Sequence, residues 1–172
     1  MAENRRIVLV TGGQRSGKSG YAQKRALSLS DNPVYLATSR VWDDEFRERV
    51  KRHQRDRGPE WTNIEEEKAI GHHDLQGRVV VIDCVTLWAT NFYFDNKGDI
   101  ALSLEQLKAE FDLLAQQEAY LIFVTNELGM GGVSPDETQR RFTDLQGWLN
   151  QYIASKADEV ILMVSGIPMK VK

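Results

Sequence analysis

Residues 6–19 read R-I-V-L-V-T-G-G-Q-R-S-G-K-S. Residues 7–10 are apolar and mostly β-branched, which is typical of a buried strand. Residues 12–19 match G-x-x-x-x-G-K-S, the phosphate-binding P-loop, and a helix-forming run follows at residues 21–29. Because strand, loop and helix come in the order that the motif requires, the stretch predicts a nucleoside triphosphate site rather than an ordinary glycine-rich turn.

Each residue type in this loop has a role in phosphate binding. Gly12 and Gly17 accept backbone angles that a side chain would forbid, so successive N–H groups can point at phosphate oxygens. The helix expected to begin near Lys18 adds the positive end of its dipole. We expect the Lys18 ammonium to contact the β and γ phosphates and the Ser19 hydroxyl to bind Mg²⁺.

The composition is that of an ordinary globular protein, with 41% hydrophobic and 27% charged residues. We expect one domain over residues 1–172, because the length suits a single core and no linker divides it. The net charge of −3 disfavours a dedicated nucleic-acid binder. A single cysteine, Cys84, excludes an internal disulfide and a thiolate zinc cluster. With no signal peptide and no apolar run of about 20 residues, we expect a cytoplasmic protein without a membrane span.

Short apolar runs and amphipathic segments alternate along the rest of the chain. This alternation predicts an α/β fold, a mostly parallel sheet with helices on both faces. We expect the acidic segment at residues 61–67 to be a solvated connector anchored by Trp61. Further strands are expected at residues 34–37, 79–83, 120–124, 159–164 and, as a short edge strand, 169–172; helices are expected at residues 43–57, 85–94, 102–118 and 136–156.

Polar residues follow two of the predicted strands, at the edge where such sheets bind ligands. Ala37, Thr38 and Ser39 end one strand, and Asp83 ends the next. An acid in that position, downstream of a P-loop, binds Mg²⁺ directly or through water. The glycine-rich loop at residues 125–135 should reach the same edge, either as a mobile substrate loop or as an ordinary connection.

His53 lies on the predicted helix at residues 43–57, which also carries many arginines. Phe46, Val50 and His53 share one face of this helix by their spacing. Neighbouring cations disfavour the imidazolium, which would leave a neutral, nucleophilic imidazole near a bound phosphate. From the residues alone, a structural histidine is the simpler interpretation, and most of the arginines are best explained as a solvated helix surface.

Seven segments, in order, carry a resemblance to a known family. The seven segments are T-G-G-Q-R-S-G-K-S, Y-L-A-T-S, D-D-E-F-R-E-R-V-K-R-H-Q-R-D-R with Trp61 and Glu65 beyond it, V-I-D-C-V-T-L-W-A-T-N, T-N-E-L-G-M-G, R-R-F-T-D-L-Q-G-W-L-N-Q, and A-D-E-V followed by V-S-G-I-P-M-K-V-K. Through these segments, from about residue 8 to the C-terminus, the chain resembles the bifunctional adenosylcobinamide kinase / adenosylcobinamide-phosphate guanylyltransferases of cobalamin biosynthesis. The chain departs from the family at one point, since residues 131–135 read G-G-V-S-P where relatives usually read G-I-V-P-E.

The resemblance implies a P-loop, RecA-like fold and a role for His53 as the histidine that carries GMP. It implies GTP and ATP as substrates, Mg²⁺ held by Ser19 and Asp83, a corrinoid substrate (adenosylcobinamide), and a homotrimer. The aromatic helix at residues 85–94 would be buried or would line the corrinoid site. The catalytic residues implied are His53 and Lys18. The implied nucleotide contacts are Gly12, Gly13, Gln14, Arg15, Ser16, Gly17, Lys18, Ser19, Ala37, Thr38, Ser39, Gln54, Arg55, Asp56, Arg57, Glu65 and Asp83.

The chemistry that the resemblance implies has two steps. A phosphoryl group passes from the nucleotide to the aminopropanol hydroxyl of adenosylcobinamide. GMP then passes from GTP to His53 and on to adenosylcobinamide phosphate, giving adenosylcobinamide-GDP. Two other interpretations fit parts of the sequence. One is a plain small-molecule kinase in which His53 is structural, and the other is a RecA-like module that binds single-stranded nucleic acid through the arginine-rich face.

Overall fold

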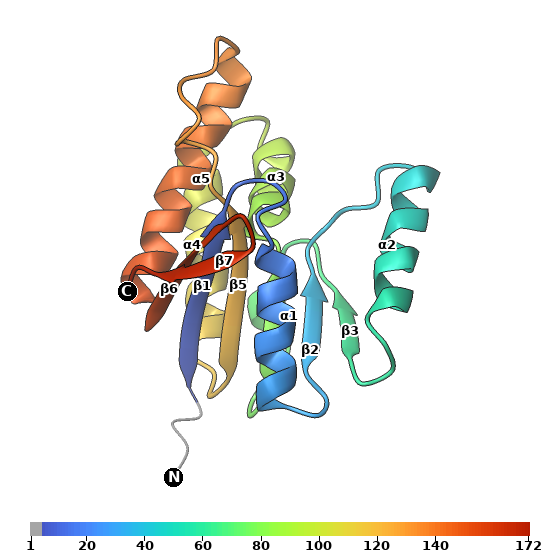
Figure 1. Ribbon diagram of the computed structural model, residues 1–172. Helices are drawn as coiled ribbons and strands as arrows, with labels where there is room; N and C mark the ends of the chain where they lie inside the picture. The colour runs from blue at the N-terminus through green and yellow to red at the C-terminus, as the bar shows by residue number, and fades with distance from the viewer. Residues whose placement is uncertain (1–4) are drawn as a thin grey trace.

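The computed structural model describes residues 5–172, which form one sheet covered by helices (Figure 1). Within these residues the strand order is β3-β2-β4-β5-β1-β6-β7, and only β7 runs antiparallel to its neighbour. This arrangement confirms the predicted α/β fold. The elements are β1 (Arg6–Gly12), α1 (Lys18–Leu29), β2 (Val34–Ala37), α2 (Asp44–Asp56), β3 (Thr62–Glu65), the 3₁₀ turn η1 (Ile70–His72), β4 (Val79–Asp83), α3 (Val85–Asp95), α4 (Ile100–Ala115), β5 (Tyr120–Asn126), α5 (Glu137–Lys156), β6 (Glu159–Val164) and β7 (Ile167–Lys170).

The sheet register brings the P-loop and Asp83 to the same edge. Strand β5 lies between β1 and β4, with Gly12 opposite Asn126 and Asp83 opposite Val124. Because these strands are parallel, the loops that follow their carboxyl ends all emerge on one side of the sheet. One strand therefore separates the start of the P-loop from the acid that ends β4.

Alternate residues of β1 face two separate cores. Val8 and Val10 lie in a cluster with Ala22 and Ala26 of α1. Ile7 and Leu9 belong to the larger cluster, which α3, α4 and α5 cover on the other face. This strict alternation is what a strand covered by helices on both faces requires. It fixes the β1 carboxyl end, and with it the P-loop, relative to both helical layers.

Helix α2 stands apart from the body of the domain (Figure 1). None of its residues is buried. It begins after Asp43, whose carboxylate accepts a hydrogen bond of 2.7 Å from the Phe46 N–H, and acids fill its first turn. The helix is therefore stabilised mainly by its own cap and charges, and its position depends on the segments at its two ends.

Two sequence-based expectations for the sheet edges were wrong. The acidic connector expected at residues 61–67 contains β3, which pairs in parallel with β2 as the edge strand. Its residues alternate between half-buried and exposed, and although Thr62 and Ile64 are strand formers, the run is short, acidic at its end and without an apolar stretch, so it does not stand out as a strand. At the other edge, β7 begins at Ile167, before the expected residue 169, because a tight turn pairs it with β6. No helix in residues 5–172 combines the length and the apolar character needed to cross a membrane.

Candidate active site

The P-loop is held in place by the turn between β6 and β7. Gly17 precedes α1 with φ of 93°, a conformation that favours glycine. A Cβ atom there would lie 3.2 Å from the Cα atom of Gly166. The Gly166 N–H also donates a hydrogen bond of 2.8 Å to the Ser16 carbonyl. The loop is therefore fixed from both sides, by the start of α1 and by this turn.

Lys18 lies inside the loop that it follows. Its side chain is buried, and its ammonium donates to the Gly13 carbonyl and to Ser16 Oγ. Burial lowers the pKa of Lys18, while the nearby Asp83 carboxylate and Cys84 act in the opposite direction. The ammonium thus occupies the centre of the loop, where the lysine of this motif contacts phosphates.

Asp83 joins three elements through one oxygen atom. Its Oδ2 accepts hydrogen bonds of 2.7 Å from the Ser19 hydroxyl and 2.7 Å from the Tyr35 hydroxyl. Burial raises the pKa of Tyr35 far above its usual value, and the charge of Asp83 raises it further. The phenol therefore keeps its proton and remains a hydrogen-bond donor. A hydroxyl and a carboxylate are the protein ligands that a nucleotide-bound Mg²⁺ takes in P-loop proteins, so Ser19 and Asp83 fit that ion.

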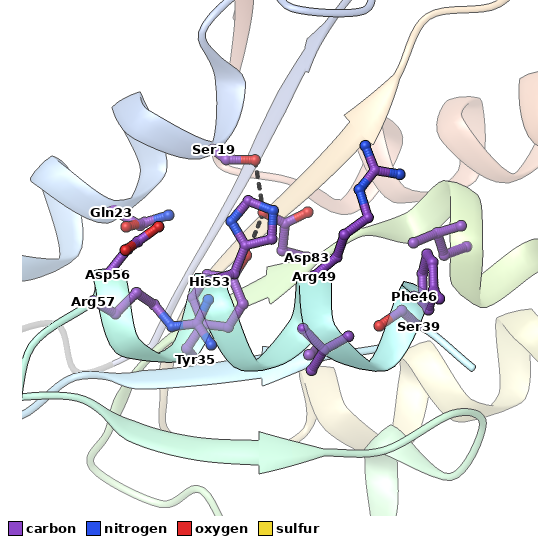
Figure 2. A pocket seen from close by; sticks show the side chains of 13 residues that line it. Ser19, Gln23, Tyr35, Ser39, Phe46, Arg49, His53, Asp56, Arg57 and Asp83 are labelled. Carbon is purple, nitrogen blue, oxygen red and sulfur yellow. Dashed lines mark hydrogen bonds between the residues drawn. The ribbon is translucent and has the colours of Figure 1, made fainter. Parts of the chain in front are cut away.

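A cavity of about 340 Å³ opens beside this carboxylate (Figure 2). Strand ends, the first turns of α1 and one face of α2 enclose it. His53 lines this cavity together with Ser19 and Asp83, and Figure 2 shows the three side chains on its wall. The complete lining is Ser19, Gln23, Tyr35, Ala37, Ser39, Phe46, Arg49, Val50, His53, Asp56, Arg57, Asp83 and Leu87.

Arg57 connects the end of α2 to the wall of the cavity. Its guanidinium carbon lies 3.6 Å from the centroid of the Tyr35 ring, and its nitrogens donate to Asn63 Oδ1 at 3.1 and 2.9 Å. The residue is buried, and this burial lowers its pKa. A stacked, desolvated guanidinium of this kind fixes the helix end more firmly than an exposed ion pair would.

His53 is the one histidine of the chain's three that lines the cavity. His72 lies 3.2 Å from a Glu110 oxygen, and His73 lies 3.1 Å from a Glu66 oxygen, both elsewhere. The thiol of Cys84, which follows Asp83, is buried, and this burial raises its pKa to about 12. His53 gives the cavity an imidazole, a side chain that can act as a nucleophile.

The cavity is lined by some, but not all, of the residues that the sequence predicted around the nucleotide. Gln54 Nε2 donates a hydrogen bond of 2.7 Å to Glu65 Oε1, so these two side chains contact each other. Arg55 turns toward Glu48 and Lys51 on another face of α2. The expected residues that line the cavity are Ser19, Ala37, Ser39, His53, Asp56, Arg57 and Asp83; those that do not line it are Gly12, Gly13, Gln14, Arg15, Ser16, Gly17, Lys18, Thr38, Gln54, Arg55 and Glu65.

The side chain of Thr38 stabilises the fold and does not line the cavity. It is fully buried, and its hydroxyl donates to the Cys84 carbonyl at 2.7 Å and accepts from the Cys84 N–H at 3.0 Å. These bonds tie the end of β2 to the segment that follows β4. The side chain of Thr38 is therefore occupied, and only its backbone remains near the site.

Sequence reasoning did not assign several lining residues to the site. Tyr35 is the alternate residue of β2 before Ala37, so the strand period could have placed it on the same side. Gln23 lies one helical turn after Ser19 and shares its face of α1. Nothing in the sequence distinguishes Arg49 from the other cations of its arginine-rich helix, or Leu87 from the other apolar residues of its helix. The spacing of Phe46 and Val50 predicts that they share a helix face with His53, but not that they line the site.

The chain is similar to one protein family over nearly its whole length. The model of the family described as "Cobinamide kinase / cobinamide phosphate guanyltransferase" matches residues 8–171. The "Bifunctional adenosylcobalamin biosynthesis protein CobU" of Escherichia coli (strain K12) is 38% identical, covering 96% of this chain and 99% of that protein. The protein of the same name from Salmonella typhimurium is 36% identical, with the same coverage. "Bifunctional adenosylcobalamin biosynthesis protein CobP" of Pseudomonas aeruginosa is 34% identical, covering 95% and 96%.

A solved structure supports the fold. The flagellar accessory protein FlaH from Methanocaldococcus jannaschii superposes with a TM-score of 0.50, covering 97% of this chain and 78% of that chain. The two sequences are 12% identical, so this likeness concerns the fold alone.

Proposed function

Because the chain belongs to the cobinamide kinase / cobinamide phosphate guanyltransferase family, we propose that it transfers GMP through a covalent adduct on His53. As a member of this family the chain is a bifunctional enzyme of cobalamin biosynthesis that uses nucleotides. The acceptor in the second reaction is adenosylcobinamide phosphate, and the product is adenosylcobinamide-GDP. The observation that carries the proposal is that His53 lines one cavity with Ser19 and Asp83.

The guanylyl transfer divides into two displacements at the α-phosphorus. A ring nitrogen of His53 attacks that phosphorus, a P–N bond forms, the bond to the bridging oxygen breaks, and pyrophosphate leaves. The proton on the other ring nitrogen passes to solvent in this step. A phosphate oxygen of adenosylcobinamide phosphate then attacks the same phosphorus, the P–N bond breaks, and the imidazole regains a proton.

The neighbours of His53 support this role. The P-loop N–H groups and Lys18 would stabilise the charge on the departing pyrophosphate. Ser19 and Asp83 would hold Mg²⁺, which would neutralise part of the phosphate charge when bound. Since no residue of α2 is buried, the helix can adjust its position over the nucleotide without disrupting the core.

The kinase reaction would use the same P-loop. The terminal hydroxyl of the aminopropanol arm attacks the γ-phosphorus of GTP or ATP, so the new P–O bond joins the phosphoryl group to the corrinoid and the nucleoside diphosphate leaves. The hydroxyl proton passes to a base or to solvent. Positioning by the loop and the strand ends would supply most of the rate enhancement. We also propose a cytoplasmic homotrimer, which sedimentation and localisation measurements would test.

Labelling with nucleotide tests the His53 adduct directly. The protein is incubated with α-³²P-GTP and Mg²⁺, denatured, and separated by electrophoresis. We expect a protein-bound label that is labile in acid and stable in base, as phosphoramidates are, and no label from γ-³²P-GTP. The variant His53→Ala should lose the label, whereas the matched variant His72→Ala should keep it, because His72 lies beside Glu110 outside the cavity.

Two results would contradict the proposal. One is undiminished label in His53→Ala, which would place the adduct on another residue. The other is transfer of GMP to adenosylcobinamide phosphate at the normal rate by His53→Ala, which would mean direct transfer without an adduct.

A further inference from the structure

The cavity beside His53 is too small for the whole corrinoid. Its volume of about 340 Å³ lies at the lower end of ligand pockets, which span roughly 300–1,000 Å³. A nucleoside triphosphate would fill much of such a space. The reacting hydroxyl or phosphate of the corrinoid is at the end of a flexible arm, so only this arm needs to enter. The macrocycle must therefore rest on the surface outside the cavity.

Two exposed aromatic side chains form a pair at that surface. Trp42 and Phe94 are 56% and 58% exposed, and their ring centroids are 6.1 Å apart in an edge-to-face arrangement. Among residues 5–172, Trp148 is the one other large aromatic side chain that is similarly exposed, and it belongs to α5. The segment of Trp42 connects two residues that line the cavity, Ser39 and Phe46. The segment that carries Trp42 is therefore attached to the cavity wall at both of its ends.

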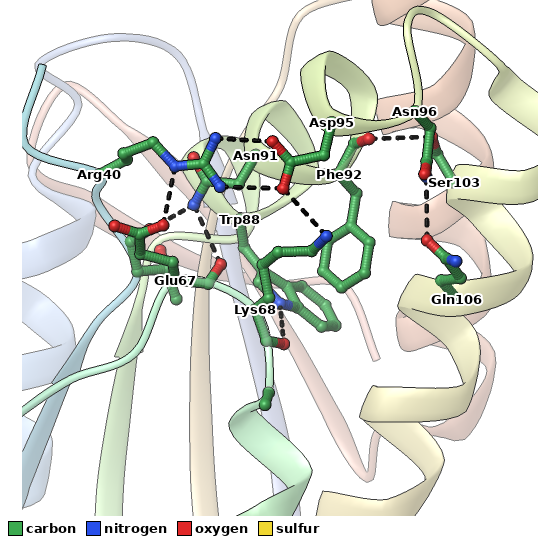
Figure 3. Close-up of polar contacts among 12 residues, drawn as sticks. Arg40, Glu67, Lys68, Trp88, Asn91, Phe92, Asp95, Asn96, Ser103 and Gln106 are labelled. Carbon is green, nitrogen blue, oxygen red and sulfur yellow. Dashed lines mark hydrogen bonds and ion pairs between the residues drawn. The ribbon is translucent and has the colours of Figure 1, made fainter.

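A polar base beside the pair is formed by hydrogen bonds among Arg40, Glu67, Lys68 and Asp95 (Figure 3). Arg40 donates two hydrogen bonds to the Asp95 carboxylate, at 2.8 and 3.0 Å, and one to Glu67 at 2.7 Å. Lys68 adds a bond of 3.0 Å to Asp95. The Arg40 guanidinium also lies 5.6 Å from the Trp42 ring centroid. Because Asp95 follows Phe94 directly, this network fixes the two aromatic residues relative to each other.

A second set of bonds attaches this base to the core. Asn91 of α3 is buried, and its amide donates to the Thr38 carbonyl at 2.8 Å and to the Glu67 carbonyl at 3.0 Å. The segment between β2 and α2 is thereby held against α3. Rigid aromatic side chains of this kind give contact area at little loss of conformational entropy.

The negative charge beside the aromatic pair suits a corrinoid ligand. Asp43, Asp44 and Glu45 follow Trp42 directly and are exposed. A cobalt(III) corrinoid with an alkyl upper ligand and neutral amide side chains carries a net positive charge. An acidic turn next to an exposed apolar pair therefore complements a flat, weakly cationic macrocycle better than it complements an anion.

We propose that Trp42 and Phe94 form the platform on which the corrin macrocycle of the substrate docks, while its aminopropanol arm enters the cavity toward His53 and the P-loop. This inference rests on the proposed function and adds to it the residues that recognise the macrocycle. The macrocycle covers the two rings, the Arg40–Asp95 network keeps them in place, and the arm passes Ser39 and Phe46.

Steady-state kinetics on variants tests the platform. With GTP saturating and adenosylcobinamide phosphate varied, we expect KM for the corrinoid to rise roughly tenfold in Trp42→Ala and in Phe94→Ala, as for loss of an aromatic stacking contact. The GMP adduct formed from GTP alone should be unchanged, because it needs no corrinoid. Trp42→Phe should retain most of the affinity. The control Trp148→Ala removes a similarly exposed aromatic residue and should leave KM unchanged.

The outcomes separate the platform from the proposed function. A KM for the corrinoid that stays within about twofold of the unaltered protein in both alanine variants would overturn the platform. A changed sedimentation coefficient in those variants, with KM unchanged, would assign the pair to an interface between copies and would also overturn it. If the unaltered protein takes no GMP label from GTP, the proposed function fails and the platform with it. If the unaltered protein takes the GMP label but the alanine variants have a normal KM for the corrinoid, the platform is contradicted and the proposed function is not.

Discussion

The hydroxyl of Ser19 donates a hydrogen bond of 2.7 Å to Asp83 Oδ2, which joins the first turn of α1 to the end of β4. Tyr35 donates to the same oxygen at 2.7 Å from β2. One carboxylate therefore connects the P-loop helix to two strands that form the wall of the cavity. Its charge is also the feature that a divalent cation would need at this point.

Asp83→Asn should impair both reactions through the metal. An amide keeps the shape of the side chain but supplies no charge, so we expect turnover to fall by roughly 10²-fold and the Mg²⁺ concentration for half-maximal activity to rise. The measurement is the rate of each reaction over a Mg²⁺ titration. The control Tyr35→Phe loses one hydrogen bond to the same oxygen, which costs about 1 kcal/mol of stability, and should keep the normal Mg²⁺ dependence. A normal titration for Asp83→Asn would contradict the assignment.

Arg57→Ala should weaken GTP binding and adduct formation more than Arg55→Ala does. Arg57 is buried, stacks on Tyr35 and lines the cavity, whereas Arg55 is exposed on another face of α2. The variant loses the stacking on Tyr35 and the hydrogen bonds to Asn63 Oδ1, so we expect a cost of about 2 kcal/mol in unfolding free energy as well. Nucleotide titration and urea unfolding of both variants are the measurements. Equal effects from the two variants would show that only the total charge of the helix matters.

The predicted fold was accurate where it depended on short-range patterns. The start of α1 at Lys18 and the bounds of β2 and β4 follow from runs of residues with a clear period or a clear stop signal. The arrangement of these parts also followed, because parallel strands place their carboxyl ends at one edge. Edge strand β3 could not be predicted in this way, since its sequence T-N-I-E has no apolar run.

The resemblance assigned whole runs of residues to the nucleotide, and the backbone geometry selects among them. Successive strand side chains alternate, so Thr38 turns away from the side that Ala37 and Ser39 share. On α2, Asp56 lies three positions after His53 and shares its face, whereas Gln54 and Arg55 lie one and two positions after it. The period of each element therefore explains which members of a run line the cavity.

Gly17→Ala and Gly147→Ala should change stability in opposite directions. At Gly17, φ is 93° and a Cβ atom would lie 3.2 Å from the Gly166 backbone, so we expect a loss of about 1–2 kcal/mol and a weakened P-loop. Gly147 lies inside α5, and a Cβ atom there would meet nothing within 4 Å. Alanine at that position should therefore add about 0.5–1 kcal/mol. Urea unfolding free energies of the two variants, with GTP affinity measured alongside, check both expectations; stabilisation by Gly17→Ala would contradict the strained loop.

Glu159→Gln should remove part of the stability that the protein has at neutral pH, and the loss should vanish in acid. The Arg25 guanidinium donates to Glu159 at 2.7 and 2.9 Å, and this bonding lowers the pKa of Glu159 from 4.5 to about 2. A folded-state pKa below the unfolded value favours the folded state above pH 4.5, and this contribution is lost as the pH falls through about 2. We expect the variant to be less stable by about 2 kcal/mol at pH 7, because the largely buried Arg25 loses its charged partner. Unfolding free energies at several pH values between 7 and 2 should show the difference between the two proteins narrowing below pH 4.5. A difference in unfolding free energy that stays constant over this range would contradict the prediction. It would mean that the charge of Glu159 contributes nothing, and that the Arg25–Glu159 pair acts only through hydrogen-bond geometry.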